Sequence, residues 1–229
     1  MGAILWDFDG TLARREGMWA GCLVEVLDAE DPGHGLQRED FRPALRHGFP
    51  WHRPEVPHPE LDTPDAWWAP VEALLAAAYA GNGYDGDRAA ALARLARARY
   101  PDPAHAWSLF DDTLPVLEGL RAAGFRHVVL SNHVPELDAL VAALGLGGLV
   151  DEVVNSAVTG YEKPHAEAFA AGRRAAGDPE TLWMVGDNPV ADVEGAEAAG
   201  IPAILVRGAS GTTLADAAAR ISRNEPAAR

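Results

Sequence analysis

Two carboxylates near the N-terminus stand at a spacing that suits nucleophilic and acid–base chemistry. Asp7 and Asp9 follow a short apolar run, and residues two apart on an extended chain point to the same side. Gly10 permits a tight turn, and free N–H groups beyond it, at Thr11, could cradle an anion. One such carboxylate could attack a phosphoryl group while the other moves protons.

The chain contains 18 arginines and a single lysine, Lys163, which precedes Pro164 at the start of a helical segment. A composition that otherwise uses arginine favours a requirement here for a compact ammonium rather than a guanidinium fork. Chance is the alternative, because a single lysine must fall somewhere. Its place beside the other polar clusters favours a functional role.

Polar residues also close two further apolar runs. Ser131 and Asn132 follow one, and Asp187 follows another, with Asp192 five residues later. Carboxylates that converge repel one another unless a cation lies among them, and oxygen ligands without clustered Cys or His favour Mg²⁺. These residues could instead cap strands and helices, since each type is common there.

The elements that must position these residues alternate regularly. We predict strands at 3–8, 126–131, 150–155, 182–185 and 203–206, and helices at 112–123, 135–144, 164–176, 190–199 and 212–222. This order predicts an α/β fold, a doubly wound parallel sheet with a Rossmann-like core and helices on both faces. Ligands of such sheets bind at the carboxyl ends of the strands, where every polar cluster stands.

Residues 14–111 interrupt this alternation. They are predicted to hold helices at 16–27, 39–46, 64–80 and 87–99, a proline-rich loop at 49–64 and no strand. We therefore predict a Rossmann-like core from residues 1–13 and 112–229, and an inserted all-helical domain from residues 14–111. That insertion is called the helical lobe below.

The motifs DFDGTL (7–12), SN (131–132), EKP (162–164) and GDNPVAD (186–192) stand in an order that resembles the haloacid dehalogenase-like hydrolase superfamily, in its phosphatase branch with a helical cap. The resemblance covers residues 3–12 and about 112–207. It implies that Asp7 is the nucleophile and Asp9 the general acid/base. It further implies roles for the remaining motif residues: Mg²⁺ held by Asp7, the Asp9 carbonyl and Asp187, Asp192 supporting the metal or the lysine, and the phosphoryl group bound by Ser131 and Lys163 with Gly10, Thr11 and Asn132 assisting.

The resulting prediction is a Mg²⁺-dependent phosphatase that hydrolyses a small-molecule phosphate monoester through an aspartyl-phosphate. A sugar phosphomutase of the same superfamily is the first alternative, although Thr11 leans towards hydrolysis. A haloacid dehalogenase is disfavoured because members with that activity lack the acid found here at Asp9. A catalytically silent binding module is the remaining alternative.

The composition limits the partners. Lys and Arg total 19 against 34 Asp and Glu, so the net charge of −15 argues against nucleic acid and anionic membranes. A lone cysteine, Cys22, and no visible signal peptide lead us to expect a cytoplasmic protein, with Cys22 buried. The family resemblance implies a monomer or a homodimer.

Substrate selectivity is expected to reside in the helical lobe. Its tryptophans could fill the lobe's core or face the site; we expect one of Trp67 and Trp68 in the core. The arginines Arg14, Arg15 and Arg53 could meet a substrate anion. The histidines beside the motifs, His133 and His165, are expected in solvated loops.

Overall fold

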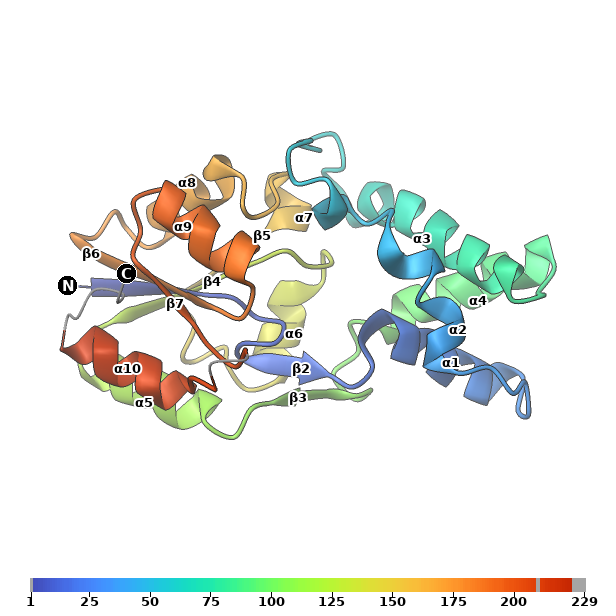
Figure 1. Ribbon diagram of the computed structural model, residues 1–229, viewed down its shortest axis with the longest axis horizontal. Helices are drawn as coiled ribbons and strands as arrows, with labels where there is room; N and C mark the ends of the chain where they lie inside the picture. Colours follow the sequence, from blue (N-terminus) through green and yellow to red (C-terminus); the bar gives the residue numbers. More distant parts are fainter. Residues whose placement is uncertain (1, 209–210, 224–229) are drawn as a thin grey trace.

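The computed structural model describes residues 2–208 and 211–223, an α/β core at one end of an elongated molecule and helices at the other (Figure 1). The core sheet has five parallel strands in the order β5-β4-β1-β6-β7. The strands are β1 (Gly2–Trp6), β4 (Arg126–Ser131), β5 (Glu152–Asn155), β6 (Thr181–Gly186) and β7 (Ala203–Leu205). The predicted doubly wound α/β architecture is therefore confirmed.

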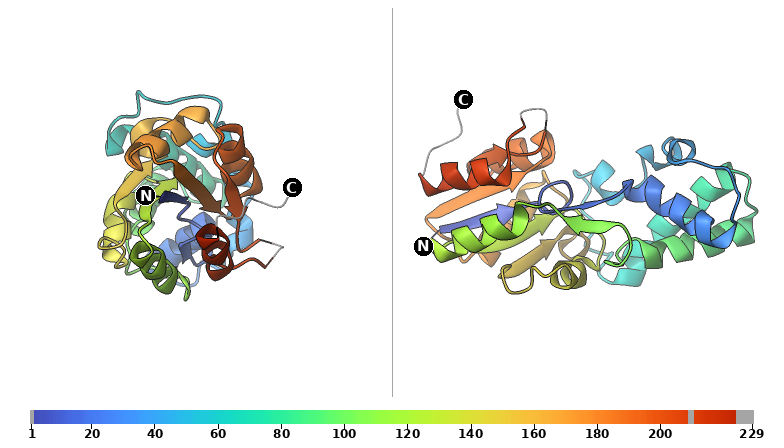
Figure 2. Two further views of the ribbon diagram at one scale, coloured as in Figure 1. Left: turned by 90° about the vertical axis from the view of Figure 1, so that its left-hand side faces the viewer. Right: turned by 90° about the horizontal axis from the view of Figure 1, so that it is seen from below.

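Alternation along β1 shows why the sheet is covered on both faces. Ile4 and Trp6 belong to one hydrophobic cluster, while Ala3 and Leu5 belong to the other, and all four are fully buried. Helices α5 (Thr113–Ala122), α6 (Leu137–Ala143) and α10 (Leu214–Ser222) supply the first cluster. Helices α8 (Ala166–Ala175) and α9 (Gly195–Ala198) supply the second, and Figure 2 shows the two layers on opposite sides of the sheet.

The helical lobe contains α1 (Met18–Glu30), α2 (Arg38–Phe41), α3 (Pro64–Gly81) and α4 (Gly86–Arg99), with 3₁₀ turns at Ala44–Arg46 and Pro50–His52. Helix α3 begins where Thr63 caps it by accepting a hydrogen bond from the N–H of Ala66, and Pro64 occupies the first turn. Both Trp67 and Trp68 are fully buried, so the prediction that one of them lies in the core holds and neither is left at the surface.

The expectation that residues 14–111 hold no strand is wrong. The chain enters the lobe through β2 (Ala13–Arg15) and leaves it through β3 (Trp107–Leu109), and these segments pair antiparallel (Figure 1). Each strand is only three residues long, too short for an alternating hydrophobic pattern to reveal it, and their partners lie about 90 residues apart. The pairing joins both crossings between core and lobe into one ribbon.

Four smaller details also differ from the sequence prediction. The predicted helix 190–199 is a π-type turn at Pro189–Glu194 followed by α9, a short helix α7 (Ser156–Thr159) follows β5, and the predicted helix 39–46 is divided between α2 and a 3₁₀ turn. The predicted strand 3–8 ends at Trp6, so Asp7 and Asp9 lie in the loop after it. Within the described residues, no helix combines the length and apolar character needed to cross a bilayer.

Candidate active site

Strand β1 lies at the centre of the sheet, and the chain continues to β4 and β5 on one side and to β6 and β7 on the other, so three polar segments that follow β1, β4 and β6 lie side by side. Strand β1 lies between β4 and β6, and Asp7, Ser131 and Asp187 stand at or just beyond the carboxyl ends of these three strands. The backbone N–H of Asp7 still donates to the carbonyl of Val185, which fixes the nucleophile candidate beside β6. The crevice predicted from the parallel order is therefore the place where the polar clusters meet.

Asp7 is anchored through one carboxylate oxygen. Its Oδ1 accepts hydrogen bonds from Ser131 Oγ at 2.9 Å and from Lys163 Nζ at 2.8 Å. Among the described residues, no hydrogen bond to Oδ2 is found, so that oxygen stays available to an incoming group. The carboxylate is buried apart from about a tenth of its side-chain surface.

Lys163 is enclosed by carboxylates. Its Nζ lies 2.5 Å from Asp192 Oδ1 as well as 2.8 Å from Asp7 Oδ1, and the side chain is 2% exposed. Burial alone would lower the pKa of this ammonium, but the charges and hydrogen bonds of Asp192 and Asp7 raise its pKa above the usual value. The lysine is therefore a fixed positive charge at neutral pH.

The amide of Asn132 holds the backbone that carries this lysine. Lys163 N–H donates to Asn132 Oδ1 at 2.7 Å, and Asn132 Nδ2 donates to the Lys163 carbonyl at 2.9 Å. The pair of bonds ties the loop after β4 to the segment that precedes α8. In the structure Asn132 thus positions Lys163, whereas the family resemblance implied that Asn132 assists in binding the phosphoryl group.

Asp187 and Asp192 complete the acidic cluster. Asp7, Asp187 and Asp192 each offer a carboxylate oxygen within 4.8 Å of the others. Burial, then the charges of Asp7 and Asp192, raise the pKa of Asp187 to about 7. Burial also leads in raising the pKa of Asp192 to about 6, against the lowering influence of Lys163.

The donor set fits a hard divalent cation, since it consists of oxygen atoms that repel one another when they are ionised. Asp7 and Asp187 have the freer carboxylates. Asp192 already uses Oδ1 for Lys163 and Oδ2 to accept from the N–H of Asn188 at 3.0 Å. Its geometry therefore suits orientation of the lysine better than direct ligation.

Two glycines make room for these carboxylates. A Cβ at Gly10, whose φ is +79°, would overlap the Asp187 carboxylate, and a Cβ at Gly186 would overlap that of Asp192. Gly10 thus adjoins the acidic cluster. The N–H groups expected to be free in this turn are already engaged: that of Gly10 donates to the carbonyl of Ala13, and that of Thr11 donates to the carbonyl of Phe8. Thr11 itself is fully buried and does not line the cavity described next.

A cavity of about 440 Å³ opens over the cluster. From the core it is lined by all the acids named above together with Ser131, Asn132 and Lys163. From the helical lobe it is lined by Met18, Trp19, Trp51, Pro54 and Tyr100. The cavity therefore lies between the core and the lobe, with ionic chemistry on one wall and aromatic rings on the other.

Asp9 occupies a different environment from Asp7. Its Oδ1 is buried without a hydrogen-bond partner, and its Oδ2 lies 3.7 Å from His133 Nε2. Burial, then the charges of Asp7 and Asp187, raise the pKa of Asp9 well above its usual range. Burial lowers the pKa of His133 to about 4, so the ring is neutral and does not ionise Asp9. A raised pKa favours the protonated form of Asp9, which is the form that a general acid requires.

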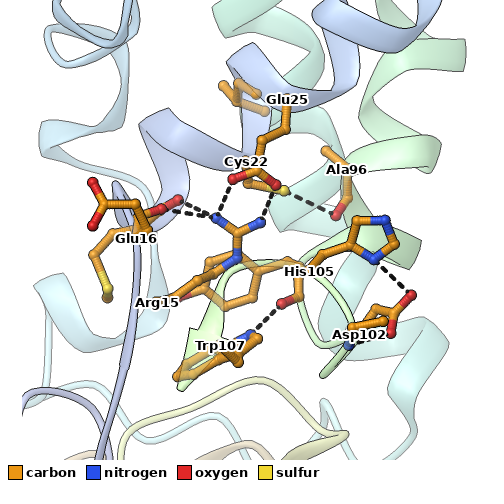
Figure 3. A network of polar contacts seen from close by, with 12 residues as sticks. Arg15, Glu16, Cys22, Glu25, Ala96, Asp102, His105 and Trp107 are labelled. Carbon is orange, nitrogen blue, oxygen red and sulfur yellow. Dashed lines mark hydrogen bonds and ion pairs between the residues drawn. The ribbon is translucent and has the colours of Figure 1, made fainter. Parts of the chain in front are cut away.

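Sequence reasoning missed His133 and Tyr100. The expectation of a solvated loop for His133 is wrong, since the residue is 2% exposed, packs edge-on against Phe8 and lines the cavity. Tyr100 follows α4 directly, 36 residues beyond the end of the proline-rich loop at 49–64, and carried no local signal. The burial expected for Cys22 is confirmed, and its thiol faces the carbonyl of Ala96 (Figure 3).

Comparison with known proteins identifies the family. The family model described as haloacid dehalogenase-like hydrolase matches residues 1–200 of this sequence. The human haloacid dehalogenase-like hydrolase domain-containing protein 3 is 30% identical over 217 residues, which cover 90% of this chain and 81% of that protein. A phosphoglycolate phosphatase of Rhodospirillum rubrum is 36% identical over 214 residues, with coverage of 89% and 78%.

The fold is shared with solved structures as well. The crystal structure of 2-haloacid dehalogenase from Pseudomonas syringae pv. Tomato DC3000 superposes with a TM-score of 0.68, 24% identity and coverage of 97% of this chain and 99% of that one. At that identity the likeness concerns the fold alone. The family model and the relatives agree with the motifs at the strand ends, and the chain belongs to the haloacid dehalogenase-like hydrolases.

Proposed function

We propose that this hydrolase is a Mg²⁺-dependent phosphatase acting on a small-molecule phosphate monoester. The observation that carries the proposal is the asymmetric anchoring of Asp7, whose Oδ1 is held by Ser131 and Lys163 while Oδ2 is free. A nucleophilic carboxylate needs a fixed orientation and an unengaged oxygen, and this one has both. A relative named as a phosphoglycolate phosphatase agrees with phosphate-ester chemistry.

In this mechanism Asp7 Oδ2 attacks phosphorus, the bond from phosphorus to the ester oxygen breaks, and Asp9 gives its proton to the departing alcohol. Asp9, now ionised, then takes a proton from water, which attacks the aspartyl-phosphate and regenerates Asp7. Lys163 and Ser131 lie where they can contact the transferring group. Asp7 and Asp187 would hold Mg²⁺, which supplies positive charge to the phosphoryl oxygens.

The elevated pKa of Asp9 supports this division of labour. Burial and the charges of Asp7 and Asp187 raise the pKa of Asp9, which favours the protonated form that can give a proton to the leaving alcohol. A cytoplasmic setting, a monomer or homodimer and the domain limits 1–13, 112–229 and 14–111 remain predictions of the sequence.

The test is release of inorganic phosphate from a panel of phosphate esters, with Mg²⁺ or EDTA, by the wild type and by Asp7→Asn. We expect turnover that EDTA and the substitution both abolish. Isomerised product without phosphate release would identify a phosphomutase, and halide release from 2-chloropropionate would identify a dehalogenase. Mg²⁺ binding without any turnover would identify a binding module.

A further inference from the structure

The wall that the helical lobe contributes to the cavity is aromatic and carries no charge. Met18, Trp19, Trp51, Pro54 and Tyr100 form it. Trp19 and Tyr100 stack with ring centroids 3.6 Å apart and planes 5° apart, and Trp51 continues the stack at 6.3 Å from Trp19. The leaving group of a bound ester would therefore meet a wall built largely of aromatic rings.

This wall is held rigidly from behind. Phe49 stacks on Trp51 at 4.7 Å, and the Arg15 guanidinium lies 5.3 Å from the ring centre of Tyr100. The indole N–H of Trp107 donates to the Tyr100 carbonyl at 2.6 Å. Figure 3 shows Arg15 between Glu25 and the backbone at Glu16, with Trp107 beside it, so the group behind Tyr100 is itself fixed.

The hydroxyl of Tyr100 is polar and unengaged. Among the described residues it has no hydrogen-bond partner, yet its ring is 2% exposed and lines the cavity. Asp9 lies close enough for its charge to help raise the pKa of this phenol, after the larger effect of burial. A neutral hydroxyl on a clamped ring is a preorganised hydrogen-bonding group.

Cationic side chains are scarce around the cavity. Within the described residues, Lys163 is the one lysine or arginine that lines it, and both of its ion pairs are made to the protein. Arg15 faces Glu25, Arg14 lies over the ring of Phe110, and Arg53 lines a separate cavity. In the proposed function Lys163 and Mg²⁺ serve the phosphoryl group, so a carboxylate on the leaving group would face the lobe's wall with no lysine or arginine lining it to receive the charge.

Resting on the proposed phosphatase activity, we propose that the substrate's alcohol is uncharged and presents a flat apolar face to Trp19 and Trp51, with a hydrogen bond to the Tyr100 hydroxyl. Esters whose alcohol carries a carboxylate are rejected. The substrate class thus differs from that of the relative named for phosphoglycolate. The aromatic stack, the free hydroxyl and the missing cation all lead to this same class.

The test compares kcat/KM for two esters of similar shape, 4-(carboxymethyl)phenyl phosphate and its uncharged methyl ester, 4-(2-methoxy-2-oxoethyl)phenyl phosphate. In both, a methylene group insulates the ring from the carboxyl function, so the two phenols are leaving groups of similar reactivity. We expect the charged ester to be at least about tenfold poorer, a factor equivalent to about 1.4 kcal/mol. Equal rates, a preference for the carboxylate, or a preference for choline phosphate over both would overturn the proposal.

Variants at the wall give an independent readout. Trp51 is partly exposed, so we expect Trp51→Arg to fold, which circular dichroism checks, and to supply the missing cation. It should raise the ratio of charged to uncharged ester turnover severalfold. Tyr100→Phe should lower kcat/KM for the uncharged ester several-fold, whereas the matched control Tyr84→Phe, at a tyrosine paired with Asp31 in the helical lobe, should not.

The outcomes separate this inference from the proposed function. Hydrolysis of esters with no discrimination by charge, or a Trp51→Arg ratio equal to that of the wild type, refutes the substrate class and leaves the phosphatase intact. Hydrolysis of no ester, with Asp7→Asn indistinguishable from the wild type, refutes both.

Discussion

Replacing Lys163 by methionine tests whether the ammonium holds the acidic cluster together. The substitution keeps most of the side-chain length and removes the charge. At an effective dielectric constant of about 20, each of the two contacts at 2.8 and 2.5 Å is worth about 6 kcal/mol of Coulomb attraction, before desolvation is subtracted. Breaking buried pairs of this kind costs about 3–5 kcal/mol, a large share of a typical domain's stability.

The assay is urea unfolding followed by tryptophan fluorescence, in EDTA so that no cation substitutes for the lysine. At about pH 7.5 we expect Lys163→Met to lose about 3–5 kcal/mol of unfolding free energy. The control Arg94→Met removes an exposed cation from α4 and should change it by less than about 0.5 kcal/mol.

The loss should shrink as the pH falls. Asp187 and Asp192 have folded-state pKa values raised to about 7 and 6, so their ionisation destabilises the folded state above those values. Protonation at about pH 5.5 removes the repulsion that the missing ammonium leaves behind. A loss below about 1 kcal/mol at about pH 7.5, or an equal loss at both pH values, would refute this reasoning.

Three further predictions concern the neighbouring structure. Gly186→Ala should abolish activity and lower the melting temperature, because the added methyl group overlaps the Asp192 carboxylate; circular dichroism and the phosphate assay check this. The buried contact between His58 Nε2 and Glu162 Oε1, 2.9 Å long, joins lobe and core, and the hydrogen bond to Glu162 raises the pKa of His58. The stability that this contact contributes is therefore fully present below the pKa of His58 in the unfolded chain and is lost as the pH rises through the higher pKa of the folded protein. Over that pH window the melting temperature of the wild type should fall relative to that of Glu162→Gln. Parallel curves of melting temperature against pH for the two proteins would contradict this prediction. Saturating Mg²⁺ should stabilise the wild type by about 2–3 kcal/mol at roughly 100 times its Kd and leave Asp187→Asn unmoved, as calorimetry can show.

Local sequence signals account for most of the core. Strand 126–131 is a short apolar run, and helix 113–122 has a helical apolar period and is followed by Gly124, so their types and order could be predicted. The parallel order then brings Asp7, Ser131 and Asp187 to one edge without further information. Each of these sequence patterns spans fewer than 15 residues, so this part of the site can be predicted from local sequence.

The remainder depends on contacts between distant residues. Strands β2 and β3 pair with each other across the whole helical lobe, and Tyr100 reaches the cavity because α4 ends beside Trp19. His133 was expected in solvent because histidine in a loop is usually exposed, yet Phe8 and Trp107 enclose it. Such packing is decided by tertiary structure, which a single sequence does not reveal.

The most direct test of the central claim is to trap the covalent intermediate. Protein turning over a good ester in Mg²⁺ is quenched in acid, digested and mapped by mass spectrometry, with Asp7→Asn as the control. The account predicts one added phosphoryl group on the peptide that contains Asp7 and none in the variant. A phosphoryl group on another peptide, or unimpaired hydrolysis by Asp7→Asn, would contradict it.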